Sequence, residues 1–509
     1  MNLKREAVKN VSATWICLLV HAAVSFLLSP FVLHRLGDAA FGIWVLIFSL
    51  TGYFGLLDLG IRSSIVRFVA NAAANRNDDQ LQRLFVTSLY FYCGVAIIVL
   101  VLTGIGYYYL PELFKVPISL MAPARILLLL VGISVAFTFP LSLSAGVLEG
   151  LQKFARVQVT QCAFTVLRGA AVAVALISGG GLLTVGFITV GANLGGYVLL
   201  MCMAHNRFPL SAKMNLVDMK ILRKMMGHGA FAFIIILAEK LRFQSDALLI
   251  GAYLSATAIV VYAVSSRLVE YSTYAIRSMA QIFTPLASQF HAAGEEQQLR
   301  RVVLVGNRAC ALIVFPLVTA FVVLGRSIIE VWVGSRYVSG YFVLVLLIVP
   351  RGLYLAQSAS TRVLLGTGRH QMMAWVLLFE GMLNVLLSLA LLPRFGILGV
   401  AVGTAVPLAC TSLIFLPWHV SHKLGVPLSR LITSTFLSPI ALCIPLIAVL
   451  WYLTYSFPAH HYASLIAELS IGAAVYVATL AISLVLAAPG GKFWIREIRH
   501  LLEPQYEYR

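Results

Sequence analysis

The sequence predicts an all-α, polytopic membrane protein with about fourteen membrane-spanning helices. These would form two six-helix bundles related by a pseudo-twofold axis, followed by two C-terminal helices. Three observations lead to this class. The 509 residues are 60% hydrophobic and only 11% charged, with a mean hydropathy of +0.93, whereas soluble domains carry about 25% charged residues. The apolar sequence runs along the whole chain, and a pattern near its start returns about 216 residues later.

The apolar stretches are each long enough to cross a bilayer, which takes roughly 20 residues of helix. No small-residue cleavage site follows the first stretch, so a cleavable signal is not expected. In chain order, the expected spans lie at residues 11–34, 40–61, 85–110, 121–146, 158–178, 182–203, 227–252, 257–281, 304–324, 339–365, 370–392, 397–418, 431–455 and 463–488.

The internal repeat relates the first six spans to the next six. SPFVLHRLGDAAFGIW, from Ser29, is matched by SDALLIGAYLSATAIVVY, from Ser245, and further matches follow at a near-constant shift. Because six is even, both copies enter the membrane from the same side, and the repeat is parallel, not inverted. Duplicated bundles are the usual plan of a transporter. The predicted organisation is a first bundle over 1–210, a second over 211–420, an extra helix pair over 421–489 and a cytoplasmic tail over 490–509.

The formal charge of +18 is explained by membrane topology better than by nucleic-acid binding. With the N-terminus inside, the inner segments hold 23 Lys and Arg residues and the outer segments hold 5. Basic residues concentrate on cytoplasmic loops. The sequence therefore predicts that both termini are cytoplasmic.

Motifs for common enzymatic and metal chemistry are missing from the sequence. There is no GxxxxGK[ST] and no HExxH, and none of the seven cysteines forms a CxxC. The cysteines fall inside apolar spans, as small core residues do. We expect no catalytic residue, no metal and no cofactor, and the protein is predicted not to be an enzyme.

Charged side chains inside the expected spans are the strongest functional signal. Each costs at least about 2.5–3.5 kcal/mol at mid-bilayer, so it must face other helices or a water-filled cavity. The basic residues predicted to line a cationic cavity are Arg168, Lys240, Arg242, Arg267, Arg277, Arg351 and Arg362. The acidic residues predicted to carry a coupling ion are Asp58, Glu239, Asp246, Glu270 and Glu380, expected to be the only acids clearly within spans at useful depth.

The spacing of these charges places them on shared helix faces. Glu239, Arg242 and Asp246 are i, i+3 and i+7. Arg351 and Arg362 are three turns apart, and Gln161 shares a face with Arg168 in the same way.

One alternative is that these charges only form ion pairs within a helix, Glu239 with Arg242 and Arg267 with Glu270. Near the midplane, however, the cations outnumber the acids. An electropositive cavity favours an anionic cargo, and the planar fork of arginine suits phosphate. A buried carboxylate could take up H⁺ or Na⁺ and couple cargo movement to an ion gradient.

A longer motif identifies a resemblance to a known family. FGLLDLGIRSSIVRFVA, from Phe54, and GVLEGLQKF, from Gly146, resemble the polysaccharide-export branch of the multidrug/oligosaccharidyl-lipid/polysaccharide exporter superfamily. The resemblance covers about residues 10–420. It implies two six-helix bundles plus an extra pair, a cationic central cavity, and alternating access driven by an ion gradient or the membrane potential.

The same resemblance implies a function at the bacterial inner membrane. The protein would translocate an undecaprenyl-diphosphate-linked oligosaccharide for cell-surface polysaccharide biosynthesis, alongside membrane lipids, a polysaccharide polymerase and a chain-length regulator. One alternative is an ion-coupled drug or cation antiporter of the same superfamily, which the arginine excess opposes. Another is a membrane glycosyltransferase or polymerase, which would need a sizeable outer loop or a catalytic cluster.

Overall fold

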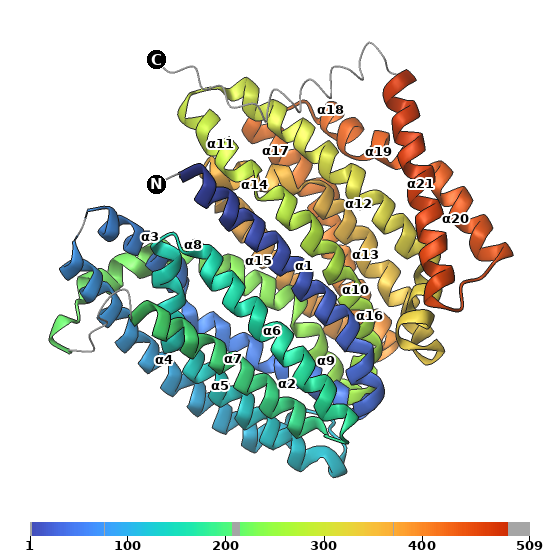
Figure 1. Ribbon diagram of the computed structural model, residues 1–509. Helices are drawn as coiled ribbons and strands as arrows, with labels where there is room; N and C mark the ends of the chain where they lie inside the picture. Colours follow the sequence, from blue (N-terminus) through green and yellow to red (C-terminus); the bar gives the residue numbers. More distant parts are fainter. Residues whose placement is uncertain (1–2, 76, 206–213, 370, 487–509) are drawn as a thin grey trace. The chain divides into compact units, whose positions relative to one another are not determined.

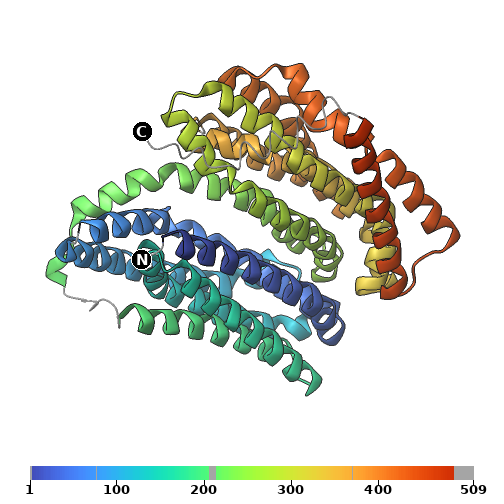
Figure 2. The ribbon, with the colours of Figure 1, turned by 45° about the horizontal axis from the view of Figure 1, so that its top comes forward.

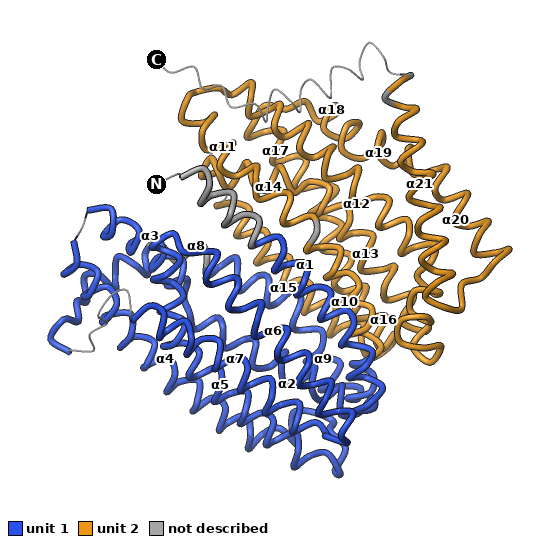
Figure 3. Tube along the Cα trace, viewed as in Figure 1, with its two compact units in different colours: residues 1–260 blue, residues 261–509 orange. Residues whose placement is uncertain are grey.

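The computed structural model describes residues 3–75, 77–205, 214–369 and 371–486, with the backbone alone given for 3–13, 228–232, 275, 484 and 486. Every regular element in these ranges is helical, which confirms the all-α class. The chain folds into two compact units, residues 1–260 and 261–509 (Figure 3). The predicted tail over 490–509 and the middle of the basic loop at 206–213 lie outside the described residues.

Unit 1 is built around one long helix, α5, which packs against α2, α3, α4, α6 and α7. Such a position requires a helix that is apolar on all sides, and the buried residues of α5 lie along its whole length. α1 lies beside α6 in both ribbon views (Figures 1 and 2). The helices are α1 Leu3–Leu36, α2 Asp38–Gly52, α3 Ile61–Ala74, α4 Asp78–Leu113, α5 Ile118–Gly150, α6 Phe154–Ile177, α7 Leu182–His205, α8 Met219–Phe243, α9 Ser245–Tyr253 and the start of α10 Ala256–Ala280.

Unit 2 repeats several packing partners of unit 1. α4 packs on α5, α5 on α7 and α6 on α7; likewise α12 packs on α13, α13 on α16 and α15 on α16. After α10, its helices are α11 Phe283–Ala292, α12 Glu296–Val333, α13 Tyr341–Ala356, α14 Ser358–Gly366, α15 Gln371–Phe395, α16 Ile397–Cys410, α17 Leu416–Leu424, α18 Leu428–Ile432, α19 Ser438–Ala441, α20 Ile444–Ser456 and α21 Tyr462–Leu486.

The boundary between the two units lies inside α10, later in the chain than the boundary that the repeat predicts. The contacts of α8 and α9 therefore group them with the first half. The division at 210/211 describes the duplicated sequence and stays a prediction.

Within the described residues, twelve helical segments are long and apolar enough to cross a membrane. α8 and α10, whose side chains are described except at 228–232 and 275, carry half of the charged side chains discussed above. The chain is thus a multi-pass membrane protein, while the expected count of fourteen spans stays a prediction.

Several expected spans are not continuous α-helices, and two of the interruptions fall at a glutamine. The span predicted over 227–252 is interrupted at Gln244, between α8 and α9. The span predicted over 339–365 is interrupted at Gln357, between α13 and α14. The Gln357 side chain is buried and donates hydrogen bonds to the carbonyls of Leu353 and Ser412, at 3.2 and 2.7 Å. A one-residue interruption leaves the apolar pattern of a span unchanged, so hydropathy does not reveal it.

Small residues allow α15 and α16 to pack closely. A Cβ atom at Gly399 would collide with the backbone of Leu391, and one at Gly403 would collide with Ser388. Helices in a membrane approach most closely where the contact residues are small. This GxxxG pair is therefore a packing contact and not a binding site.

Candidate functional site

A polar cavity lies inside unit 1, between α1, α6 and α7. Its volume is about 490 Å³, within the range of small-molecule sites. Glutamine, asparagine, hydroxyl and basic groups line it, and among the residues whose side chains are described no Asp or Glu is part of the wall. The polar lining residues are Thr14, His21, Gln158, Gln161, Thr165, Arg168, Asn193 and Tyr197.

One face of α6 supplies half of these polar groups. Gln158, Gln161, Thr165 and Arg168 follow one another at spacings of three and four residues, which keeps them on one side of a helix. The structure places Gln161 and Arg168 together on the cavity wall, as their shared face predicts. The opposite wall comes from α7, where the Asn193 amide donates to the hydroxyl of Thr138 at 3.1 Å.

Arg168 is the charge at the centre of this arrangement. It is half-buried on α6, and it makes no hydrogen bond or ion pair with any residue that the structure describes. A cation inside membrane helices is normally paired with an acid or a carbonyl. The cavity therefore presents a fixed positive charge surrounded by neutral hydrogen-bonding groups.

A second polar cluster lies close to the cavity, around the turn between α2 and α3. The Arg62 guanidinium lies 3.5 Å from a carboxylate oxygen of Glu149. Burial lowers the pKa of Arg62, but Tyr197 and Glu149 raise it more, so the net pKa is above its ordinary value. Asp58 accepts a short hydrogen bond from the Tyr92 hydroxyl. Asp58 thus has a structural partner, and a coupling role for it stays a prediction.

The charged residues of α8 and α9 do not lie on one uninterrupted helix, as the expected stripe assumed. The interruption at Gln244 separates Asp246, in the first turn of α9, from Glu239 and Arg242 on α8. That the three share one face stays a prediction. Arg242 is buried, with its guanidinium carbon 5.1 Å from the centre of the Phe243 ring.

Lys240, on the same helix, is half-buried. Its backbone carbonyl accepts a hydrogen bond from the Tyr53 hydroxyl at 3.2 Å. Neither Lys240 nor Arg242 is part of the wall of the α1–α6–α7 cavity.

On α10, the structure confirms an ion pair within the helix. Arg267 contacts Glu270 at 2.9 Å, and the other oxygen of Glu270 accepts a hydrogen bond from the Tyr274 hydroxyl at 2.6 Å. Both charged side chains are about half exposed, 50% for Arg267 and 40% for Glu270. For these two residues the paired alternative is correct. Arg277 lies near the end of the same helix.

Arg351 and Arg362 lie on opposite sides of the interruption at Gln357, on α13 and α14. The helix between them is not continuous, and their expected shared face stays a prediction. Arg351 is only 4% exposed, and its Nε donates to the Thr273 hydroxyl of α10 at 3.2 Å. It packs inside unit 2.

Glu380 is the first of three buried polar residues on the face of α15 that contacts α16. It is 2% exposed, and Asn384 and Ser388 follow at one-turn intervals. The Asn384 amide donates to the Thr404 hydroxyl at 3.0 Å. A buried carboxylate beside amide and hydroxyl groups is a suitable place for a proton or a small cation, and this role for Glu380 stays a prediction.

The predicted cations are thus divided between the units: Arg168, Lys240 and Arg242 belong to unit 1, and Arg267, Arg277, Arg351 and Arg362 to unit 2. Only Arg168 is part of the wall of a described cavity. Convergence of the whole set on one anion would involve both units and stays a prediction.

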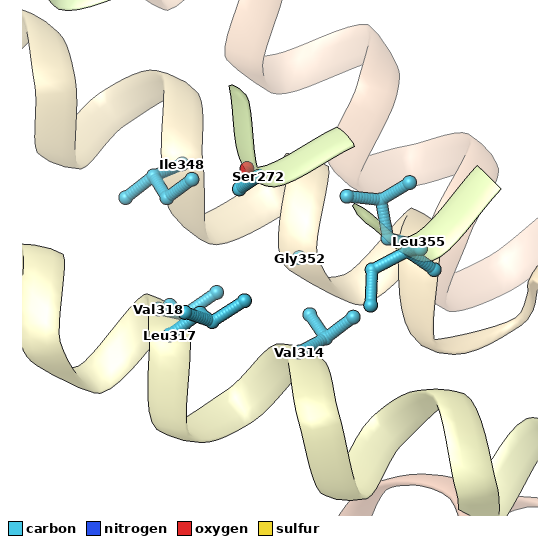
Figure 4. Close-up of a pocket in the computed structure, with 8 residues that line it drawn as sticks. Ser272, Val314, Leu317, Val318, Ile348, Gly352 and Leu355 are labelled. Carbon is cyan, nitrogen blue, oxygen red and sulfur yellow. The ribbon is translucent and has the colours of Figure 1, made fainter. Parts of the chain in front are cut away.

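A second gap, in unit 2, has no space for a water molecule and is not a binding site. Figure 4 shows its side chains converging from α10, α12 and α13 beside Gly352. Apart from Ser272 and the glycine, the lining is aliphatic. In the described part of the chain, no group of three or more His, Cys, Asp or Glu side chains is placed to hold a metal ion.

Sequence reasoning missed several residues. Gln158, Asn193 and Tyr197 are polar groups without charge, and nothing in the spacing of α7 indicates which side faces a cavity. The sequence analysis also expected the five candidate acids to be the only acids well inside membrane spans, and this expectation was wrong. Glu468 lies within the membrane-spanning part of α21 and is 4% exposed. It is the single acid in the expected span at 463–488, which could have identified it.

The cavity predicts a difference in cysteine reactivity. Cys162 lines the cavity, whereas Cys310 is fully buried. In variants that each retain one cysteine, a small charged thiol reagent should label Cys162 much faster than Cys310, because only the cavity admits water. Mass spectrometry of the intact protein measures the rates. Equal rates would show that the cavity is closed to water.

Comparisons with known proteins place the chain in a family. A family model described as "Polysaccharide biosynthesis protein" matches residues 32–340. The chain is 23% identical over 443 residues to the uncharacterized membrane protein EpsK of Bacillus subtilis, covering 82% of this chain and 83% of that one. It is 21% identical over 237 residues to the probable low-salt glycan biosynthesis flippase Agl15 of Haloferax volcanii. That second match spans 45% of this chain and only half of the relative's length.

Solved structures show the same fold at low sequence identity. The lipid II flippase MurJ, in an inward closed conformation, matches with a TM-score of 0.72 and 15% identity, over 93% of this chain and 98% of that one. An inward-facing multidrug transporter of the MATE family, MOP superfamily, matches with a TM-score of 0.65 and 13% identity, over 84% and 98%. The chain has the fold of MurJ and the MATE transporters. Because the family model matches more than half of the chain, the chain belongs to the polysaccharide biosynthesis protein family.

Proposed function

We propose that the protein is a flippase that moves an undecaprenyl-diphosphate-linked oligosaccharide across the bacterial inner membrane for cell-surface polysaccharide biosynthesis. The observation that carries this proposal is Arg168, a cation without a described partner in a polar cavity between membrane helices. Family membership and the flippases among the similar proteins support it. The activity is transport and not an enzymatic reaction.

The chemistry of the cavity fits the polar part of such a lipid. A phosphate oxygen would accept charge-assisted hydrogen bonds from the Arg168 guanidinium. Gln158, Gln161 and Asn193 offer amide donors and acceptors, the two functions that sugar hydroxyl and acetamido groups require. A volume of about 490 Å³ accommodates the diphosphate and the first sugar, and not a whole oligosaccharide. The remaining glycan and the prenyl chain would lie outside this cavity.

The energy for outward movement would come from an ion gradient or from the membrane potential. One elementary charge gains about 2.3 kcal/mol per 100 mV, so a doubly negative headgroup gains about 4.6 kcal/mol per 100 mV when the inside is negative. The acids Asp58, Glu239, Asp246, Glu270 and Glu380 are the candidates for carrying H⁺ or Na⁺. Cytoplasmic termini, alternating access, and a polymerase and a chain-length regulator as partners belong to the same proposal.

A drug or cation antiporter, the alternative with the same fold, is disfavoured by the wall of the cavity. Holding a cationic drug requires a carboxylate, and the described residues that line the cavity include Arg168 but no acid.

The proposal is tested by reconstituting the purified full-length chain in liposomes that contain a fluorescent undecaprenyl-diphosphate oligosaccharide. Quenching by a membrane-impermeant reductant measures how much lipid lies in each leaflet. We expect the protein to equilibrate the lipid between leaflets and an imposed potential to bias it. A cationic dye should not be moved. Liposomes that exchange the dye and leave the lipid in place would establish the antiporter instead.

A further inference from the structure

The C-terminal helix pair is hydrogen-bonded to α12 next to a proline inside that helix. Figure 2 shows α20 and α21 as a hairpin along α12. Pro316 lies inside α12 and has no N–H group, so the carbonyl of Leu312, four residues earlier, has no backbone partner in the helix. The Tyr476 hydroxyl of α21 donates a hydrogen bond to this carbonyl at 2.7 Å. The extra pair therefore supplies the hydrogen bond that Pro316 cannot donate to the Leu312 carbonyl.

Glu468 lies on the same buried face of α21. Leu465, Glu468, Gly472 and Tyr476 follow at spacings of three and four residues and are all buried. A Cβ atom at Gly472 would collide with the Leu450 side chain of α20, so the helices are in close contact one turn from Glu468. The carboxyl group is thus enclosed between α21 and the helices packed on it.

No partner for this carboxyl group exists among the described residues. Neither of its oxygen atoms accepts a hydrogen bond, and it forms no ion pair. α20 contains no charged residue, and its Tyr452 and Tyr455 are exposed. α12 has no charged residue between Arg308 and Arg326.

The two arginines at the ends of that stretch do not supply the missing charge. The Arg326 guanidinium lies over the rings of Tyr341 and Phe342, at 5.0 and 5.7 Å. Arg308 lies one turn before Leu312 on α12, and Leu312 is the residue that Tyr476 contacts. On α21, Tyr476 is two helical turns away from Glu468.

An ionised carboxylate in such a place would be buried in an apolar surrounding with neither a cation nor a hydrogen-bond donor. That state costs far more than taking up a proton from water. We propose that Glu468 is a proton-binding site, occupied at neutral pH while α21 is docked on α12, and emptied only when the hairpin separates far enough for water to reach the carboxyl group. Docking of the C-terminal pair is therefore linked to proton binding. This inference does not depend on which cargo the protein moves.

The occupied site is detected by infrared spectroscopy of the full-length chain in lipid nanodiscs at neutral pH. A protonated carboxyl group has a C=O stretching band that a carboxylate lacks. We expect such a band in the unchanged protein, its disappearance in Glu468→Gln, and a shifted band in Glu468→Asp. The matched control Glu330→Gln, at an exposed position near the end of α12, should retain it. If Glu468→Gln leaves the spectrum unchanged, Glu468 is ionised and the proposal is wrong.

The link to docking is measured by hydrogen–deuterium exchange of α21 in the unchanged protein and in Glu468→Gln. Comparing the two chains at the same pH removes the chemical effect of pH on exchange. They should exchange equally at neutral pH, because both side chains are neutral. At alkaline pH the unchanged protein should exchange faster, because only its carboxyl group can ionise and loosen the hairpin. Equal exchange at alkaline pH would overturn the link to docking.

Discussion

Replacing Arg168 with alanine should reduce glycan export about ten- to a hundredfold per folded molecule. A hydrogen bond to a charged group contributes about 1.5–3 kcal/mol, and every 1.4 kcal/mol is a factor of ten. Because Arg168 has no described partner, its removal leaves no buried carboxylate unpaired, and the protein should fold normally. The measurement is export in complemented cells, divided by the amount of protein in the membrane.

Two further variants show whether export depends on the charge of Arg168, on the shape of its guanidinium group, or on the loss of any arginine from the membrane helices. Arg168→Lys should restore part of the export, because the charge stays while the planar fork is lost. Arg125→Ala removes an arginine from α5 that stacks on Tyr107 at 5.1 Å and is not part of the cavity wall, so export should be nearly unchanged. Normal export in Arg168→Ala would contradict an anionic cargo in this cavity.

Replacing Glu380 with glutamine should abolish gradient-driven transport and leave cargo binding intact. The side chain is 2% exposed and stands one turn before Asn384, so the isosteric amide keeps the packing and removes only the ionisable group. The assay is accumulation of lipid-linked glycan in the outer leaflet of proteoliposomes under an imposed pH or Na⁺ gradient. Binding is measured separately in detergent.

Variants of two other acids serve as controls for Glu380→Gln. Glu112→Gln changes an exposed acid at the end of α4 and should have no effect. Asp58→Asn weakens the hydrogen bond with Tyr92, and we expect lower stability with transport retained in the folded fraction. If neutral variants of all five candidate acids accumulate glycan normally under every gradient, coupling does not pass through any of these five carboxylates.

The fold class followed from the sequence because length and hydropathy alone determine a membrane span. The interruptions at Gln244 and Gln357 did not follow, since both depend on a single residue within an apolar run. The buried amide of Gln357 bonds to a carbonyl more than fifty residues away, and this contact exists only after folding.

The site was predictable where helix spacing alone decides position. Gln161 and Arg168 share the cavity face of α6, and Arg267 pairs with Glu270 one turn away. Spacing does not show which helix a charged residue faces. The burial of Arg351 against Thr273 and the contribution of Asn193 from α7 depend on packing between helices and needed the structure.

The α1–α6–α7 cavity has a consequence for how new specificities arise in this family. Its polar wall belongs to three helices of one unit, and most of its amide and hydroxyl groups come from α6 and α7. Side chains there can be exchanged without disturbing the interlocked polar residues of α15 and α16. If the cavity holds the first sugar, as proposed, divergence toward a different sugar would require few substitutions, concentrated in one short stretch of the gene. Engineers who seek to redirect export can restrict their libraries to that stretch and keep the second half of the chain constant.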